Sequence, residues 1–225
     1  MKYVPPSFLL PSRWSSSFWR PISLVVCMFL SACTPSLQSS APRAEVYVLR
    51  PIVSAVQVES PFRLQVLPVR VRPGYATDAI LRSGPDRTLD VYAASRWPDV
   101  LPRVVEGMLV DGLKAAGIGE VLEPLSSARA EALLQVVVRR FDADYSMDPR
   151  QPRVHVQLDI TLLDRARRDV LTSFTVGSVV PVAQNRMSAI IAAFEQAGSE
   201  VLTQLSQALS DPALPRAVAS QPEAV

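Results

Sequence analysis

Residues 153–163, RVHVQLDITLL, alternate apolar and polar side chains. The apolar set is Val154, Val156, Leu158, Ile160 and Leu162, and the polar set is His155, Gln157, Asp159 and Thr161. Because successive side chains of a strand point to opposite faces of its sheet, this pattern predicts a strand with one buried face and one exposed face. A sheet is therefore the first layer of the fold, and apolar elements must cover one side of it.

Neighbouring segments predict the rest of the sheet. The charged stretch 164–169, DRARRD, separates this strand from residues 170–180, VLTSFTVGSVV, and the two strands are expected to form a long hairpin. Further strands are expected at 45–49, 63–71, 78–83, 88–93, 119–122 and 133–144, with a hairpin turn at Gly84-Pro85-Asp86.

Two segments have helical periodicity. Apolar residues recur every three or four positions from Val100 to Leu113; Asp99 is expected to cap this helix, with Pro102 in its first turn and Lys114 and Gly117 at its end. A second apolar stripe covers about 187–210 and should stop at Asp211-Pro212. The fold class is therefore α+β (mixed α/β), with one sheet of roughly five to eight strands and two long amphipathic helices packed on it.

The charge balance argues against a nucleic-acid partner. Three of the 23 basic residues lie within the first 32 positions, which leaves 20 basic against 21 acidic residues, a net charge of about −1, in the remainder. A chain this close to neutral lacks the clustered basic surface that phosphate backbones require.

The N-terminal residues predict export and lipid anchoring. Residues 1–20 carry cations and no acidic residue, and residues 21–30, PISLVVCMFL, form an apolar block of about 15 Å as a helix, too short to span a membrane. The next residues, Leu30-Ser31-Ala32-Cys33, resemble the lipobox of bacterial lipoproteins, in which the cysteine thiol is acylated. The alternative is an ordinary signal peptide with an incidental cysteine.

From this we expect a lipoprotein signal peptide at 1–32, the lipidated Cys33 and a flexible tether at 33–44, a folded domain at 45–210 and a disordered tail at 211–225. Several acyl chains on Cys33 would hold the protein firmly in a membrane, since each buried methylene contributes about 0.8 kcal/mol. Thr34 follows the cysteine, whereas an Asp there usually means retention in the inner membrane. We therefore expect the periplasmic face of the outer membrane of a diderm host.

Catalytic motifs are sparse. No G-x-x-x-x-G-K-[ST] or G-x-S-x-G sequence occurs, and the single histidine, His155, is expected to be an exposed strand residue. Asp142, Asp144 and Asp148 could bind calcium, but strand-end aspartates in a hairpin explain them better. We therefore expect no enzyme, no metal and no cofactor.

Two further sets of residues have ordinary structural explanations. Arg139 and Arg140 are adjacent on a strand, so one is expected to face away from the core, and a solvated strand edge is favoured over an anion site. Trp97 and Phe194 are expected in the core rather than stacked on a ligand.

After the lipobox, four segments resemble, in this order, the ABC-type transport auxiliary lipoprotein family, also called PqiC-like lipoproteins. They are Tyr47-Val48-Leu49, 64–83 with Pro73-Gly74-Tyr75, 96–113 with Trp97 and Leu101, and 173–209 with its Ala- and Leu-rich helix. Arg70 and Arg72 depart from the family's apolar strand at this point.

The resemblance implies a non-enzymatic outer-membrane partner of an MCE-type lipid transport system. In such systems an ABC permease and ATPase act at the inner membrane, and an MCE-domain protein bridges the periplasm to the lipoprotein. A homo-oligomer is compatible with this role. The alternatives are an assembly or pilot lipoprotein of another envelope machine, such as a secretion channel, and an envelope hydrolase with an unrecognised site.

Overall fold

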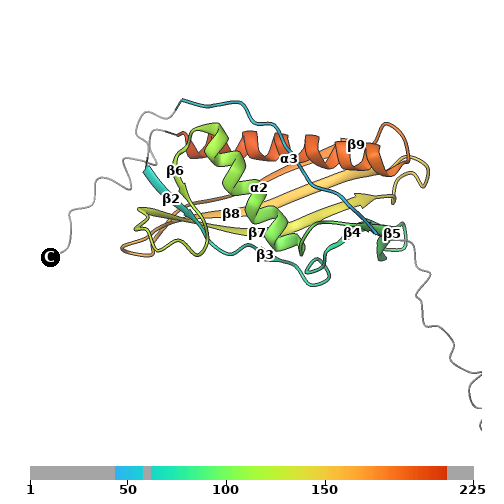
Figure 1. The fold of residues 1–225 in the computed structure, drawn as a ribbon, viewed down its shortest axis with the longest axis horizontal. Helices are drawn as coiled ribbons and strands as arrows, with labels where there is room; N and C mark the ends of the chain where they lie inside the picture. The colour runs from blue at the N-terminus through green and yellow to red at the C-terminus, as the bar shows by residue number, and fades with distance from the viewer. Residues whose placement is uncertain (1–43, 58–61, 212–225) are drawn as a thin grey trace, which may run out of the picture. The chain divides into compact units, whose positions relative to one another are not determined.

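The computed structural model describes residues 44–57 and 62–211. One sheet and two helices make up this folded unit (Figure 1). The strands are β1 (Glu45–Val46), β2 (Phe62–Val66), β3 (Arg70–Val71), β4 (Ala79–Ser83), β5 (Leu89–Arg96), β6 (Gly119–Leu122), β7 (Ala132–Asp144), β8 (Arg153–Asp164) and β9 (Val170–Pro181). The helices are α2 (Leu101–Ala116) and α3 (Met187–Leu209). The α+β prediction is confirmed, with nine strands in the described residues rather than five to eight.

β7 is the central strand of the sheet. One of its edges pairs antiparallel with β8, which pairs antiparallel with β9, so the predicted hairpin across 164–169 is present. The other edge of β7 pairs in succession with β2, β3 and β4, all parallel to it. β6 extends the sheet beyond β2, and β5 and β1 extend it beyond β4.

The helices cover one face of the sheet, and the core lies between the two layers (Figure 1). The alternating residues Val154, Val156, Leu158, Ile160 and Leu162 of β8 are all buried there. Trp97, Phe141 and Phe194 form an aromatic cluster with ring centroids 5.1–5.9 Å apart, which confirms that Trp97 and Phe194 belong to the core. The opposite face of the sheet, which we call the helix-free face, carries the polar set of β8.

A β-bulge in β7 extends one sequence-based expectation. Val138 lies opposite Leu158 and Arg140 lies opposite Gln157, so Arg139 is an extra residue on the β7 side. The bulge shifts the side-chain alternation, which buries Phe141 and directs both arginines away from the core. The expectation that one of the two arginines faces away from the core therefore holds for both, and the bulge is the reason that adjacent residues can do so.

The predicted strand 63–71 is interrupted. β2 ends at Val66 and β3 starts at Arg70. Pro68 has no amide hydrogen for the ladder, and the N–H of Val69 donates to the buried carboxylate of Glu106 on α2 at 3.0 Å rather than to β7. This interruption raises the strand count above the prediction.

The ends of α2 were predicted in part. Pro102 lies in the first turn, and Gly117 ends the helix at φ 77°, a left-handed conformation that glycine adopts without strain. The predicted cap at Asp99 is wrong: Val100 is the N-cap residue and makes no side-chain capping bond. The N–H of Leu101 instead donates to the carbonyl of Thr77 at 2.9 Å, so tertiary structure satisfies this end of the helix.

Residues 44–57, the crossing segment, begin as β1 beside β5 and then pass across the outer side of the helices (Figure 1). The N–H groups of Arg50 and Ile52 donate to Glu195 and Ser199 of α3, and the N–H of Val56 donates to the carbonyl of Ala116. In the part of the chain described, neither helix is long and apolar enough to cross a membrane.

Candidate functional site

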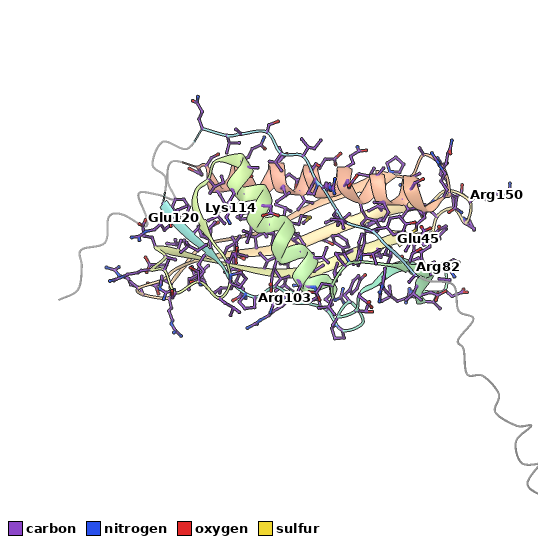
Figure 2. All side chains as sticks on the ribbon, viewed as in Figure 1. Glu45, Arg82, Arg103, Lys114, Glu120 and Arg150 are labelled. Carbon is purple, nitrogen blue, oxygen red and sulfur yellow. The ribbon has the colours of Figure 1, made fainter. Side chains whose placement is uncertain are left out.

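The predicted attachment site Cys33 lies outside the described residues, as do residues 1–32 and the tail from 212. Glu45 starts the first described strand, at the end of the folded unit that also carries Arg82 and Arg150 (Figure 2). Lys114 and Glu120 lie toward the other end (Figure 2). In the described residues, the contacts nearest to the predicted anchor along the chain are those of β1 with β5.

The most connected polar group in the described residues is the Asp142 cluster, which comprises Tyr75, Ser83, Arg140, Asp142 and Asp144. The Asp142 carboxylate is fully buried and accepts hydrogen bonds from the hydroxyls of Tyr75 at 2.8 Å and Ser83 at 2.7 Å. Arg140 donates to it from Nε at 3.2 Å and from Nη2 at 2.8 Å, and also reaches Asp144 at 3.1 Å. Three segments of the chain therefore meet at one buried charge.

The cluster depends on the bulge and on the parallel pairing of β4 with β7. The bulge aligns Arg140, Asp142 and Asp144 on the helix-free face, where Asp142 lies opposite His155. The pairing of Ser83 with Asp144 brings the end of β4 beside them. Sequence analysis singled out the aspartates but missed Tyr75 and Ser83 as their partners, because these lie 67 and 59 residues away.

Burial and neighbouring charges shift the pKa values of Tyr75, Arg140 and Asp144 in the cluster. The Asp142 carboxylate raises the pKa of Arg140, whereas burial and then the Asp142 charge raise the pKa of Tyr75. Burial raises the pKa of Asp144, but hydrogen bonds from Ser146 and Arg140 outweigh it and lower that pKa to about 2. At neutral pH Arg140 is therefore a cation and Asp144 is ionised.

His155 is half-buried beside this cluster rather than exposed as predicted. Its Nε2 lies 3.6 Å from an Asp144 oxygen. Burial and the charge of Arg140 lower its pKa, so the imidazole is neutral at pH 7. The charged groups at the end of β7 make this a more enclosed position than the alternating pattern of β8 alone indicates.

The arrangement does not match that of a serine hydrolase. Ser83 donates to Asp142, whereas the carboxylate neighbour of His155 is Asp144, so a serine–histidine hydrogen bond is missing from the described contacts. The three aspartates of the calcium hypothesis, Asp142, Asp144 and Asp148, also have different partners. Asp142 and Asp144 bind Arg140, and Asp148 accepts the N–H of Arg150 at 2.7 Å within its own loop.

The model of the ABC-type transport auxiliary lipoprotein component family matches residues 47–206. The chain belongs to this family. It is an auxiliary lipoprotein of ABC-type transport, a family that is not known for enzymes.

Two solved structures with TM-scores above 0.5 share the fold of this auxiliary lipoprotein. A Xanthomonas campestris protein of family DUF330 superimposes with a TM-score of 0.67 at 24% identity, over 72% of this chain and 93% of the other. A second, uncharacterized protein gives 0.59 at 15% identity, over 75% and 99%. A PelC dodecamer from Paraburkholderia phytofirmans gives 0.41 at 18% identity, over 68% and 93%. No curated protein matches the chain.

The residues that carry the family resemblance lie at structural junctions of this auxiliary lipoprotein. Tyr47 and Leu49 pack against the core, together with Val53 and Val56 of the same crossing segment. Tyr75 donates to Asp142, and Trp97 packs edge-on against Phe141 and Phe194. These residues therefore hold the fold together.

Proposed function

We propose that this protein is a non-enzymatic outer-membrane lipoprotein subunit of an ABC/MCE-type intermembrane lipid transport system. It docks or receives the MCE-domain protein that spans the periplasm, and Cys33 carries its acyl chains. The proposed organisation is a signal peptide at 1–32, a lipidated tether at 33–44, the transport auxiliary domain at 45–210 and a tail at 211–225. The family match over residues 47–206 is the observation that carries this proposal.

Two features support the anchored role. The Leu-Ser-Ala-Cys sequence at 30–33 has the spacing of a lipobox, and Thr34 lacks the charge associated with inner-membrane retention. In addition, the crossing segment is hydrogen-bonded to both helices, so a chain anchored at Cys33 enters the fold only about a dozen residues later. A tether of this length reaches about 18 Å on average, which keeps the domain near the membrane surface.

Partner identification tests the function. The tagged, lipidated protein is purified from detergent-solubilised envelopes, and its partners are identified by mass spectrometry with the untagged strain as control. We expect an MCE-domain protein together with an ABC permease and ATPase. Recovery of a secretin or another envelope machine would instead favour an assembly or pilot lipoprotein.

The chain offers a matched pair of variants for the anchor. Cys33→Ser should abolish incorporation of labelled palmitate and release the protein from the membrane, because serine lacks the thiol that is acylated. Cys27→Ser removes the other cysteine of the chain, inside the predicted signal peptide, and should leave labelling unchanged. Palmitate labelling of Cys33→Ser at the wild-type level would refute the lipobox interpretation.

A further inference from the structure

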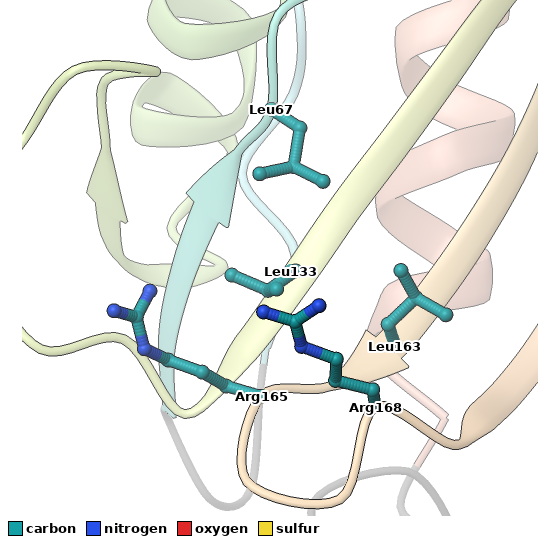
Figure 3. A pocket seen from close by; sticks show the side chains of 5 residues that line it. All are labelled: Leu67, Leu133, Leu163, Arg165 and Arg168. Atoms are coloured by element: carbon teal, nitrogen blue, oxygen red, sulfur yellow. The ribbon is translucent and has the colours of Figure 1, made fainter.

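A groove opens on the helix-free face, at the end of the sheet opposite the Asp142 cluster. It has a volume of about 460 Å³ and is lined by Leu67, Leu133, Leu163, Arg165 and Arg168; we call it the leucine–arginine groove (Figure 3). Leu133 of β7 lies directly opposite Leu163 of β8, and Leu67 follows β2 beside them. All three leucines are half-buried, so their side chains form an apolar floor.

These leucines break the polar pattern of their face. The next pair along the same two strands is Gln135 with Thr161, as expected for a sheet surface in water. At this end both members of a cross-strand pair on the helix-free face are apolar, whereas the next pairs, Gln135 with Thr161 and Val137 with Asp159, each include a polar residue. Leu133 and Leu163 take no part in the core between the sheet and the helices, so the core does not account for them.

Arg165 is fixed at the rim by a buried amide. The Gln65 side chain, 6% exposed, donates from Nε2 to the carbonyls of Pro124 and Ser126 at 3.2 Å each. Its remaining oxygen accepts a hydrogen bond from Arg165 at 2.9 Å. The hydrogen bonds from Nε2 to backbone carbonyls fix the orientation of the Gln65 amide. Its Oε1 therefore points to Arg165 and holds that guanidinium in place at the rim before a ligand binds.

Arg168 supplies the second cation from the β8–β9 turn. Its φ of 61° lies in the left-handed region, where glycine or asparagine would cost less than arginine. Figure 3 shows its guanidinium directed toward Leu133. Asp164, which precedes this turn, is buried and accepts a hydrogen bond from the backbone N–H of Arg167. Its carboxylate therefore stabilises the turn.

We propose that the leucine–arginine groove binds an acyl-chain amphiphile with an anionic head group, either phosphate or carboxylate. The leucine floor takes part of the acyl chain, and Arg165 and Arg168 bind the head group at the rim through charge-assisted hydrogen bonds. The volume lies within the range of small-ligand pockets, and a floor of three leucines with two cations at one side matches a molecule that is apolar at one end and anionic at the other. This inference rests on the proposed transport function and names the substrate class of the domain.

Photocrosslinking in intact cells tests the groove with the full, lipidated chain. p-Benzoylphenylalanine is introduced separately at Leu163 and at Leu67, so that a folding defect at one position does not decide the result. Val179, exposed on β9 of the same face, is the control position for general proximity to lipid. After irradiation the protein is purified and digested, and the masses of the adducts are measured.

We expect lipid adducts at Leu163 and Leu67 well above the Val179 level, and their mass distinguishes a phospholipid from a fatty acid. Arg165→Gln with Arg168→Gln should lower the yield by about a hundredfold, since two charged hydrogen bonds are lost and each contributes a factor of about ten. The matched double variant Arg87→Gln with Arg150→Gln, in two turns at the other end of the sheet, should leave it unchanged.

Adducts no more abundant than at Val179, peptide adducts in place of lipid, or a yield insensitive to loss of Arg165 and Arg168 would overturn the inference. Copurification of the MCE partner from the same cells separates this outcome from failure of the proposed function. Partner recovery without lipid adducts refutes the groove alone, and lipid adducts without that partner refute the MCE assignment alone.

Discussion

Replacing Asp142 by alanine should destabilise the domain more than loss of any exposed carboxylate. The substitution leaves the hydroxyls of Tyr75 and Ser83 without their acceptor and leaves Arg140 beside an apolar methyl group. Breaking a buried ion pair by removal of one partner costs about 3–5 kcal/mol. Arg140 is 31% exposed and keeps Asp144 at 3.1 Å, so we expect the lower end, about 3 kcal/mol.

Urea unfolding of a soluble form without the lipid anchor measures this cost. With an m-value of about 2 kcal/mol/M, the transition midpoint should fall by about 1.5 M. Glu131→Ala is the matched control, because the Arg63–Glu131 pair is 3.4 Å long and both side chains are 44% exposed. Loss of such a surface pair should cost less than about 1 kcal/mol.

A double-mutant cycle separates the ion pair from simple loss of packing. In an Arg140→Leu background, Asp142→Ala should cost clearly less than in the wild type, since the charge it compensates is gone. Equal midpoint shifts for Asp142→Ala and Glu131→Ala, or equal costs in both backgrounds, would refute the conclusion that the buried carboxylate organises this end of the sheet.

Two further predictions concern α2 and the single histidine. Gly107→Ala should stabilise the domain by about 1 kcal/mol through helix propensity, since a Cβ there meets nothing within 4 Å. Gly112→Ala should instead destabilise it by about 1 kcal/mol, because its Cβ would lie 2.6 Å from the buried Leu202 and overpacking outweighs propensity; urea midpoints that move in the same direction would contradict this. The His155 imidazole should titrate by NMR below its ordinary pKa of 6.5, so the unfolded chain binds more protons just below pH 6.5 and stability decreases there as the pH is lowered. His155→Gln should remove that slope, and a midpoint at or above 6.5 would show that burial does not govern this group.

Periodicity was sufficient to predict most of the secondary structure. The alternation in 153–163 and the helical stripes at 100–113 and 187–210 each arise because one face of the element is buried. Such a pattern can be seen within the segment itself, without knowledge of its neighbours in space. The structure confirms that these elements form one sheet with two helices on it. The bulge of β7 leaves a trace in its pattern, since the buried apolar positions are even-numbered up to Val138 and odd-numbered from Phe141.

Features that depend on contacts between distant segments could not be predicted. The N-terminal end of α2 is satisfied by the carbonyl of Thr77 rather than by Asp99, and the interruption between β2 and β3 depends on Glu106. The Asp142 cluster likewise requires the pairing of β4 with β7. Local propensity at Asp99 favours a cap, but propensity carries no information about which backbone groups tertiary structure will supply.

The distribution of covered and uncovered surfaces favours a role in binding over one in catalysis. The crossing segment covers the outer side of the helices, and its hydrogen bonds to α3 and α2 join the chain that follows Cys33 to the folded unit. Within residues 44–57 and 62–211 no helix covers the helix-free face of the sheet, which presents the leucine–arginine groove at one end and the Asp142 cluster at the other. At the Asp142 cluster the charged groups are paired with one another within the protein, so the cluster stabilises the fold. At the groove, half-buried leucines lie below two arginines, so this end of the face is the part of the domain best suited to receive a ligand.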